Sequence, residues 1–103
     1  MSKRLAFLEK LVADGKADSF ARYGLALEYR SQERLDDALA TFEALRADDP
    51  GYVPMYLMAG QILVGKGDKE AAARWLDEGL AAAAQKHDAH AESELRSLRD
   101  SLR

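Results

Sequence analysis

The chain has no cysteine, and only two of its 103 residues are proline, at positions 50 and 54. The absence of cysteine excludes a disulfide framework and thiolate chemistry, and it is compatible with a reducing compartment. Because proline interrupts helices, its scarcity leaves helix possible over almost the whole sequence. Alanine, leucine, glutamate and arginine are abundant, and all four favour helix. These features indicate an all-α protein.

Long apolar runs and clustered cations are also lacking. No segment approaches the roughly 20 apolar residues of a membrane span. Glu9 and Lys10 interrupt the apolar N-terminal segment, which therefore lacks the core of a signal peptide. The net charge is −3 and the cationic residues are dispersed, unlike those of a nucleic-acid-binding surface. We therefore expect one cytoplasmic domain over residues 1–103, with no nucleic-acid or membrane partner.

Apolar residues recur at helical spacing in six segments, which predicts six helices. The expected ranges are 3–13, 19–31, 35–47, 53–65, 69–86 and a last helix from Asp88 to about 102. The residues expected to cap helix N-termini are Ser2, Asp18, Asp68 and Asp88. The clearest break is the segment 48–51, which contains Pro50 and Gly51.

A period of 34 residues relates the two middle pairs of helices. Shifting the sequence by this period superimposes Ala26 on Gly60, Ala38 on Ala72 and Phe42 on Leu76. Small residues at such positions allow the two helices of a hairpin to cross closely. We expect the bulky residues of the pattern to fill the core between repeats; they are Tyr29, Phe42, Leu63 and Leu76. The period predicts repeated helix-turn-helix units.

With this pattern the chain resembles the tetratricopeptide repeat family, whose repeat reads Trp-x2-Leu-Gly-x2-Tyr, then Ala-x3-Phe, then Pro. The first unit matches with Arg22, Leu25, Ala26, Tyr29, Ala38, Phe42 and Pro50, and the second with Tyr56, Ala59, Gly60, Leu63, Ala72 and Leu76. Arg22 replaces the usual Trp, and Ala84 replaces the closing Pro. The resemblance implies a right-handed α-solenoid of about six helices. Its expected parts are an N-terminal half-repeat (1–18), repeat one (19–52), repeat two (53–86) and a capping helix (87–103).

In this family the first helix of each repeat lines a concave face. The resemblance places there Phe20, Tyr23, Leu27 and Arg30 from repeat one, and Leu57, Met58, Gln61 and Val64 from repeat two. Such an apolar groove implies a protein–protein interaction module that binds a partner peptide or helix, with Arg30 orienting an acidic group at the rim. Two alternatives stay open: a homodimer that buries the same groove, and terminal helices of the chain that cover part of it.

Other groups of residues give weaker signals of a function. His87, His90 and Glu94 could ligate zinc or nickel, as in a metal-binding accessory protein, although helix-capping and dipole roles also account for this segment. The segment 65–69 contains Gly-Lys-Gly but lacks the Ser/Thr ending and the preceding strand of a phosphate-binding loop. Lys3, Arg4 and Lys10 would allow the first helix to rest on a membrane, but its repeat register favours a capping role. We expect neither enzyme activity nor a cofactor.

Overall fold

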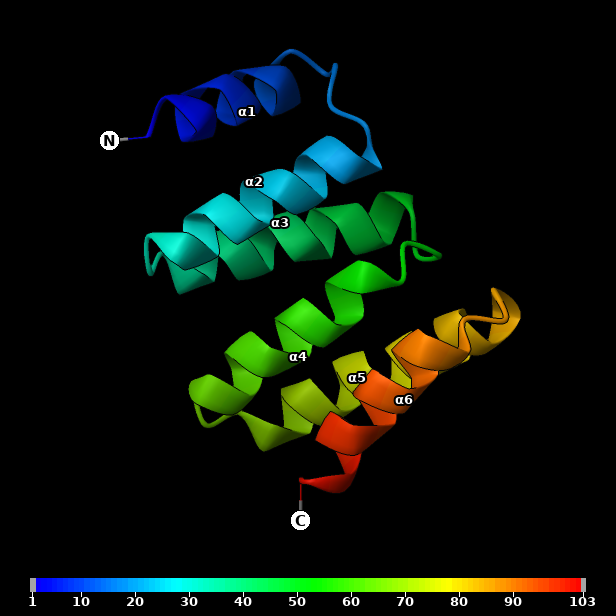
Figure 1. Ribbon diagram of the computed structural model, residues 1–103. Helices are drawn as coiled ribbons and strands as arrows, with labels where there is room; N and C mark the ends of the chain where they lie inside the picture. The colour runs from blue at the N-terminus through cyan, green and yellow to red at the C-terminus, as the bar shows by residue number, and fades with distance from the viewer. Residues whose placement is uncertain (1, 103) are drawn as a thin grey trace. The chain divides into compact units, whose positions relative to one another are not determined.

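The computed structural model describes residues 2–102, and over this range the chain forms six α-helices and no strand (Figure 1). The helices are α1 (Lys3–Ala13), α2 (Ser19–Ser31), α3 (Leu35–Asp48), α4 (Pro54–Gly65), α5 (Lys69–Gln85) and α6 (Ala89–Asp100). Their bounds lie within about two residues of the expected ranges. The chain divides into two compact units, one up to Asp49 with α1 to α3 and one from Pro50 with α4 to α6.

Four helices begin at side-chain caps. The capping residues are Ser2, Asp18, Asp68 and Asp88, and each side chain accepts a hydrogen bond from the backbone N–H three residues later. These bonds satisfy one of the N–H groups that a helix start leaves without an intrahelical partner. The four predicted caps are confirmed. Helix α4 begins differently, with Pro54 in its first turn, where the missing N–H costs nothing.

Four of the turns end their helices in the same way. In each, a backbone N–H donates to the carbonyl oxygen five residues earlier, at 2.9 Å; the donors are Lys16, Arg34, Asp68 and Asp88. The residue before each donor has a left-handed backbone; these are Gly15, Glu33, Gly67 and His87. This geometry is the Schellman motif. Asp68 and Asp88 therefore close one helix through their N–H and cap the next through their side chain.

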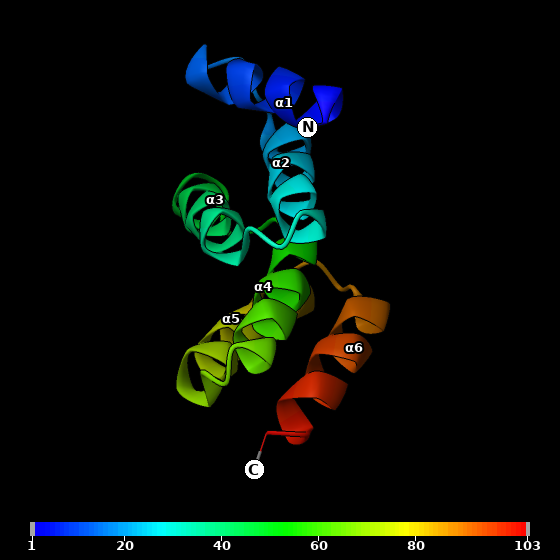
Figure 2. The same cartoon turned by 90° about the vertical axis from the view of Figure 1, so that its left-hand side faces the viewer.

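In the first unit, α2 packs against both α1 and α3 (Figures 1 and 2). Leu5 and Leu8 of α1 form a buried cluster with Leu25 of α2. At the edge of this contact, the Tyr29 hydroxyl donates a hydrogen bond of 2.6 Å to Glu9. Burial, together with this bond, raises the pKa of Tyr29 to about 12, so the phenol stays neutral. On the other side, the small residues expected at the α2–α3 crossing, Ala26 and Ala38, are fully buried.

In the second unit, α5 packs against both α4 and α6. Glycines mark the closest approaches: a Cβ atom at Gly60 would lie 2.7 Å from Leu76 Cδ2, and one at Gly79 would lie 2.5 Å from Tyr56 Cβ. Leu76, which the repeat pattern assigns to the core between repeats, thus packs against Gly60 within its own hairpin. The Gly79 approach is not part of the repeat pattern, and it also brings Leu95 of α6 close to α5.

Helix α6 is held by little apolar surface. Leu95 is its only buried side chain, at 1% exposure. The Arg99 guanidinium adds an ion pair of 2.8 Å with Asp77 on α5, which raises the pKa of Arg99. Its polar face is exposed and consists of His90, Ser93, Glu94 and Ser97. This composition fits the capping role that the sequence predicts for the last helix.

Candidate functional site

The expected groove residues of the first unit share one face of α2. They are Phe20, Tyr23, Leu27 and Arg30, at helical spacing. Other faces of α2 are occupied by the Leu25 cluster and by the contact with α3. The remaining face stays accessible, because Phe20 is 72% exposed and the other three side chains are half-buried. It runs along about 15 Å of helix.

This face has an apolar end and a polar end. Phe20 lies in the first turn of α2, whereas Tyr23 is half-buried, with its ring centroid 6.2 Å from that of Phe42 on α3. Burial raises the pKa of the Tyr23 hydroxyl, and the positive charge of Arg30 opposes this rise. Arg30 therefore lies close enough to act electrostatically on Tyr23. A neutral phenol beside a guanidinium can donate hydrogen bonds to a carboxylate.

The expected residues of the second unit share a face of α4. They are Leu57, Met58, Gln61 and Val64, and all four are half-buried. The opposite positions of α4, including Ala59, Gly60 and Leu63, are buried. Helix α4 contacts both α5 and α6. The α4 face is thus mostly apolar, with Gln61 as its one amide and Met58 as an adaptable thioether.

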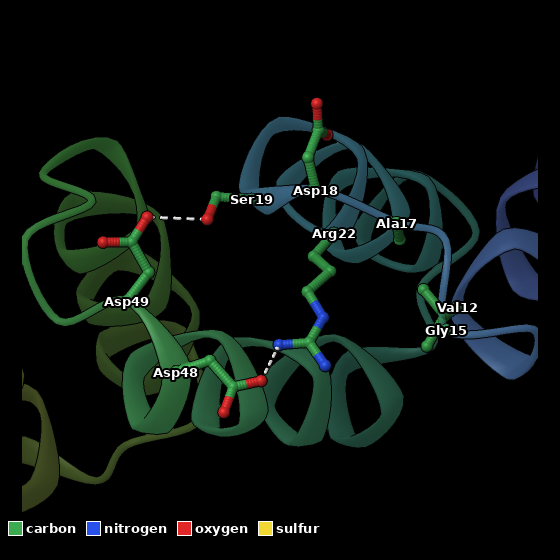
Figure 3. Close-up of a pocket in the computed structure, with 8 residues that line it drawn as sticks. All are labelled: Val12, Gly15, Ala17, Asp18, Ser19, Arg22, Asp48 and Asp49. Atoms are coloured by element: carbon green, nitrogen blue, oxygen red, sulfur yellow. Dashed lines mark hydrogen bonds and ion pairs between the residues drawn. The ribbon is translucent and has the colours of Figure 1, made fainter.

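A pocket of about 550 Å³ in the first unit was not expected from the sequence. It lies where the α1–α2 turn and the start of α2 meet the end of α3 (Figure 3). Arg22 forms an ion pair with Asp48, and the Ser19 hydroxyl donates a hydrogen bond of 2.6 Å to Asp49. Asp18 caps α2. The polar groups are engaged with one another or, in the case of Asp18, with the backbone of α2, so their contacts join the start of α2 to the end of α3. Its lining comes from segments up to 37 positions apart, which sequence spacing cannot bring together.

A different residue occupies the family's Trp position in each unit, and each residue makes its own contacts with neighbouring elements. In the first unit Arg22 of α2 pairs with Asp48 and donates to the carbonyl oxygen of Ala44, both on α3. In the second unit the Tyr56 ring lies tilted against that of Trp75, with 5.9 Å between the centroids, and its hydroxyl donates a hydrogen bond to the Pro50 carbonyl oxygen. Although neither unit has Trp at this position, the residue that replaces it still connects the first helix of the hairpin to other parts of its unit. Arg22 contacts α3, and Tyr56 contacts α5 and the segment before α4.

The candidate metal ligands are not assembled into a site. His90 Nε2 lies 3.2 Å from Glu94 on an exposed face, and His87 occupies the left-handed position of the preceding turn. Among residues 2–102, the structure contains no group of three or more His, Cys, Asp or Glu side chains that could hold a metal ion. The pair His90–Glu94 instead resembles an ordinary contact one turn apart on a helix surface.

The structure contains two hairpins related by a 34-residue period, and each has buried small residues at its crossing. A comparison of the sequence with known families agrees with this architecture. Residues 29–96 match the tetratricopeptide repeat profile. The chain belongs to the tetratricopeptide repeat family. Members of this family are generally scaffolds for protein–protein interaction.

Solved structures of bacterial proteins are similar to this one. A tetratricopeptide repeat domain protein from Salinibacter ruber, determined in solution, is 29% identical, with a TM-score of 0.79 over 82% of this chain and 86% of that chain. A crystal structure of a tetratricopeptide repeat domain protein from the same organism is 30% identical, with a TM-score of 0.76 over 80% and 92%. A protein from Bordetella parapertussis is 30% identical, with a TM-score of 0.82 over 99% and 89%.

No curated protein matches the sequence of this chain significantly. Within the part of the chain that the structure describes, every helix is too short or too polar to span a bilayer.

Proposed function

We propose that this tetratricopeptide repeat protein is an interaction module that binds a peptide or helix of a partner protein through the α2 face of its first unit, and that the α4 face of its second unit is a contact surface of the same kind. The observation that carries the proposal is the accessible stripe on α2, where Phe20 is 72% exposed beside half-buried Tyr23 and Leu27. Exposed apolar side chains that lie side by side on a folded protein commonly mark a contact surface. The family's general role as an interaction scaffold supports the same proposal.

The chemistry of the two faces suggests the form of the bound segment. An apolar surface of this kind suits an amphipathic helix or an extended apolar segment of a partner. Arg30, next to Tyr23, would orient an acidic group at one end. On α4, Gln61 would add hydrogen bonds, while Leu57, Met58 and Val64 would supply apolar contact.

Charge introduced into these faces tests the proposal. Phe20→Glu, Leu27→Glu and Met58→Glu should each weaken partner binding by about tenfold or more, because a carboxylate would replace apolar contact area. The matched control is Ala40→Glu, which adds the same charge at an exposed position of α3. A partner would be captured with wild-type protein from a host lysate, then purified and titrated against each variant, with circular dichroism to verify helicity.

Equal binding by the three groove variants and by Ala40→Glu would contradict the proposal. Phe20→Glu is the most informative of the three, because Phe20 is too exposed for its replacement to disturb the core. Light scattering separates the homodimer from partner binding. A mass that rises with concentration for wild type, but not for Phe20→Glu, would assign the same face to self-association.

A further inference from the structure

One glycine of α2 has no explanation in the repeat pattern. Gly24 lies in the middle of the helix, where glycine is destabilising relative to alanine. Its neighbours on the helix surface, three or four positions away, include Phe20, Leu27 and Glu28. At a shift of 34 residues Gly24 corresponds to Met58, a residue of the α4 face. Gly24 therefore borders the α2 face at a position where the second unit has a side chain and the first has none.

The side chain of Arg4, from α1, lies over this glycine. A Cβ atom added at Gly24 would lie 3.4 Å from a terminal nitrogen of Arg4 and 3.9 Å from Leu8 Cδ1. The Arg4 Nε lies 3.4 Å from the carboxylate of Glu28, which is one helical turn further along α2. Arg4 thus supplies to the first unit the side chain that Met58 supplies to the second.

The guanidinium of Arg4 is held in place and still accessible. The Arg4 side chain is 64% exposed, whereas that of Glu28 is only 22% exposed. Because Glu28 balances its charge, Arg4 gives this edge of the α2 face no excess charge for an acidic group. The planar guanidinium itself stays accessible, and such a group stacks on aromatic rings. Its attraction to the negative face of a ring acts at contact distance, so it does not need an excess charge.

We propose that Arg4 is part of the α2 docking surface and stacks on an aromatic side chain of the bound segment, beside Phe20. This assignment rests on the proposed function of the α2 face, and it specifies the partner as an apolar segment that contains an aromatic residue. Phe20 is 72% exposed and lies one turn from Gly24, so a single ring can contact the phenylalanine and the guanidinium together. An acidic side chain at the same place would meet the carboxylate of Glu28, and an aliphatic one would gain no electrostatic attraction to Arg4.

Two peptides that differ in one ring test the stacking directly. The probe is a fluorescent, stapled helical peptide of about four turns, with a leucine stripe and a central phenylalanine; its counterpart has cyclohexylalanine at that position. Cyclohexylalanine is similar in size and more apolar, so hydrophobic contact alone would favour the counterpart. Fluorescence anisotropy with the full chain should show that the phenylalanine peptide binds about three- to tenfold more tightly.

Two variants remove the guanidinium from the α2 face. Arg4→Met retains an unbranched side chain and should reduce the affinity ratio of the two peptides to about one. Gly24→Met should do the same, because the side chain that Met58 has in the second unit would then displace Arg4. The matched control is Arg74→Met, at an exposed position of α5, which should leave the ratio unchanged. Circular dichroism verifies that each variant keeps its helicity.

NMR gives a readout that a purely structural role of Arg4 would not change. The side-chain resonances of Arg4 should move upfield through ring currents when the phenylalanine peptide binds, and should not do so with the cyclohexylalanine peptide. Binding of the phenylalanine peptide without this shift would overturn the assignment.

The outcomes separate the role of Arg4 from the proposed function. Equal binding of the two peptides, abolished by Phe20→Glu, would overturn the role of Arg4 and retain the α2 face as the docking surface. A preference for phenylalanine that persists in Arg4→Met would assign the ring to Phe20 alone. Failure of both peptides to bind would contradict helix binding by the α2 face, and the assignment of Arg4 with it.

Discussion

Among individual residues, the four left-handed turn positions carry the clearest energetic consequence. Two are occupied by glycine, Gly15 and Gly67, and two by residues with a Cβ atom, Glu33 and His87. The four turns have the same pattern of backbone bonds, and the bond that spans five residues is 2.9 Å long in each, so the difference lies in the residue rather than in the turn. A side chain in this conformation is destabilised by contact with its own backbone, and glycine is not.

His87→Gly should therefore stabilise the protein by about 0.5–1 kcal/mol, even though glycine is more flexible in the unfolded chain. The reverse change at the equivalent position, Gly67→Ala, should destabilise it by about 1 kcal/mol. No atom lies within 4 Å of a Cβ placed at Gly67, so backbone strain alone accounts for the cost. Urea unfolding followed by circular dichroism measures both values. A stabilising Gly67→Ala would show that this turn relaxes out of its left-handed conformation.

Residue identity predicts the helix ends well but the bridges between helices poorly. Ser2, Asp18, Asp68 and Asp88 are recognisable as caps because their partners lie three residues away. The partners of Arg22 and Tyr29 lie about 20 or more positions away. Those distances depend on packing, and no local pattern encodes them. The pocket beside Arg22 escapes prediction for the same reason.

Among the helices, α5 makes one close contact that connects it to both other helices of its unit. At Gly79 it meets Tyr56 of α4 and Leu95 of α6, so one position holds the three helices of the second unit together. The repeat pattern identifies the approach at Gly60 but not this one. Gly79 gives no signal in the sequence, because a glycine inside an alanine-rich helix looks like a weak point rather than a contact.

Gly79→Ala should destabilise the protein by about 1–3 kcal/mol, although alanine is the better helix former. The added Cβ would overlap Tyr56 Cβ, at 2.5 Å, and a Cβ atom cannot move away by a change of rotamer. Gly65→Ala is the control, because Gly65 ends α4 with open space around it, and it should be neutral or slightly stabilising. Thermal unfolding of the two variants compares them, and a stabilised Gly79→Ala would contradict the close approach.

Across the whole molecule, buried side chains are distributed unevenly among the helices. Helix α4 has six buried residues and α5 has five, whereas α1 has two and α6 has one. In repeat proteins each unit is stabilised mainly by its neighbours, so terminal helices have less support. The 34-residue period makes the family predictable from sequence, because it depends on residues such as Ala38 and Gly60 that recur in register. The identity of a partner is not predictable, because the residues that would contact the exposed side chains of α2 and α1 belong to another molecule and leave no pattern in this sequence.

Native-state hydrogen exchange should follow this distribution. Backbone amides of α6 and α1 should exchange faster than those of α4 and α5, because the terminal helices can open without exposing most of the core. Exchange monitored by NMR or mass spectrometry would give the order directly. Amides of α6 that are as protected as those of α4 would mean that the chain opens only as one cooperative unit.

The dual role of Asp68 and Asp88 also determines where the chain tolerates extra residues. Because the same residue closes one helix and starts the next, adding a residue to either turn would separate the two functions and disturb both helices. The connection between α3 and α4, residues 49–53, has neither a left-handed residue nor a side-chain cap for α4. That connection is nevertheless fixed by hydrogen bonds from Ser19 to Asp49 and from Tyr56 to the Pro50 carbonyl oxygen. An epitope tag or a fluorophore site is therefore best inserted between Lys16 and Asp18, where one residue closes α1 and a different one caps α2.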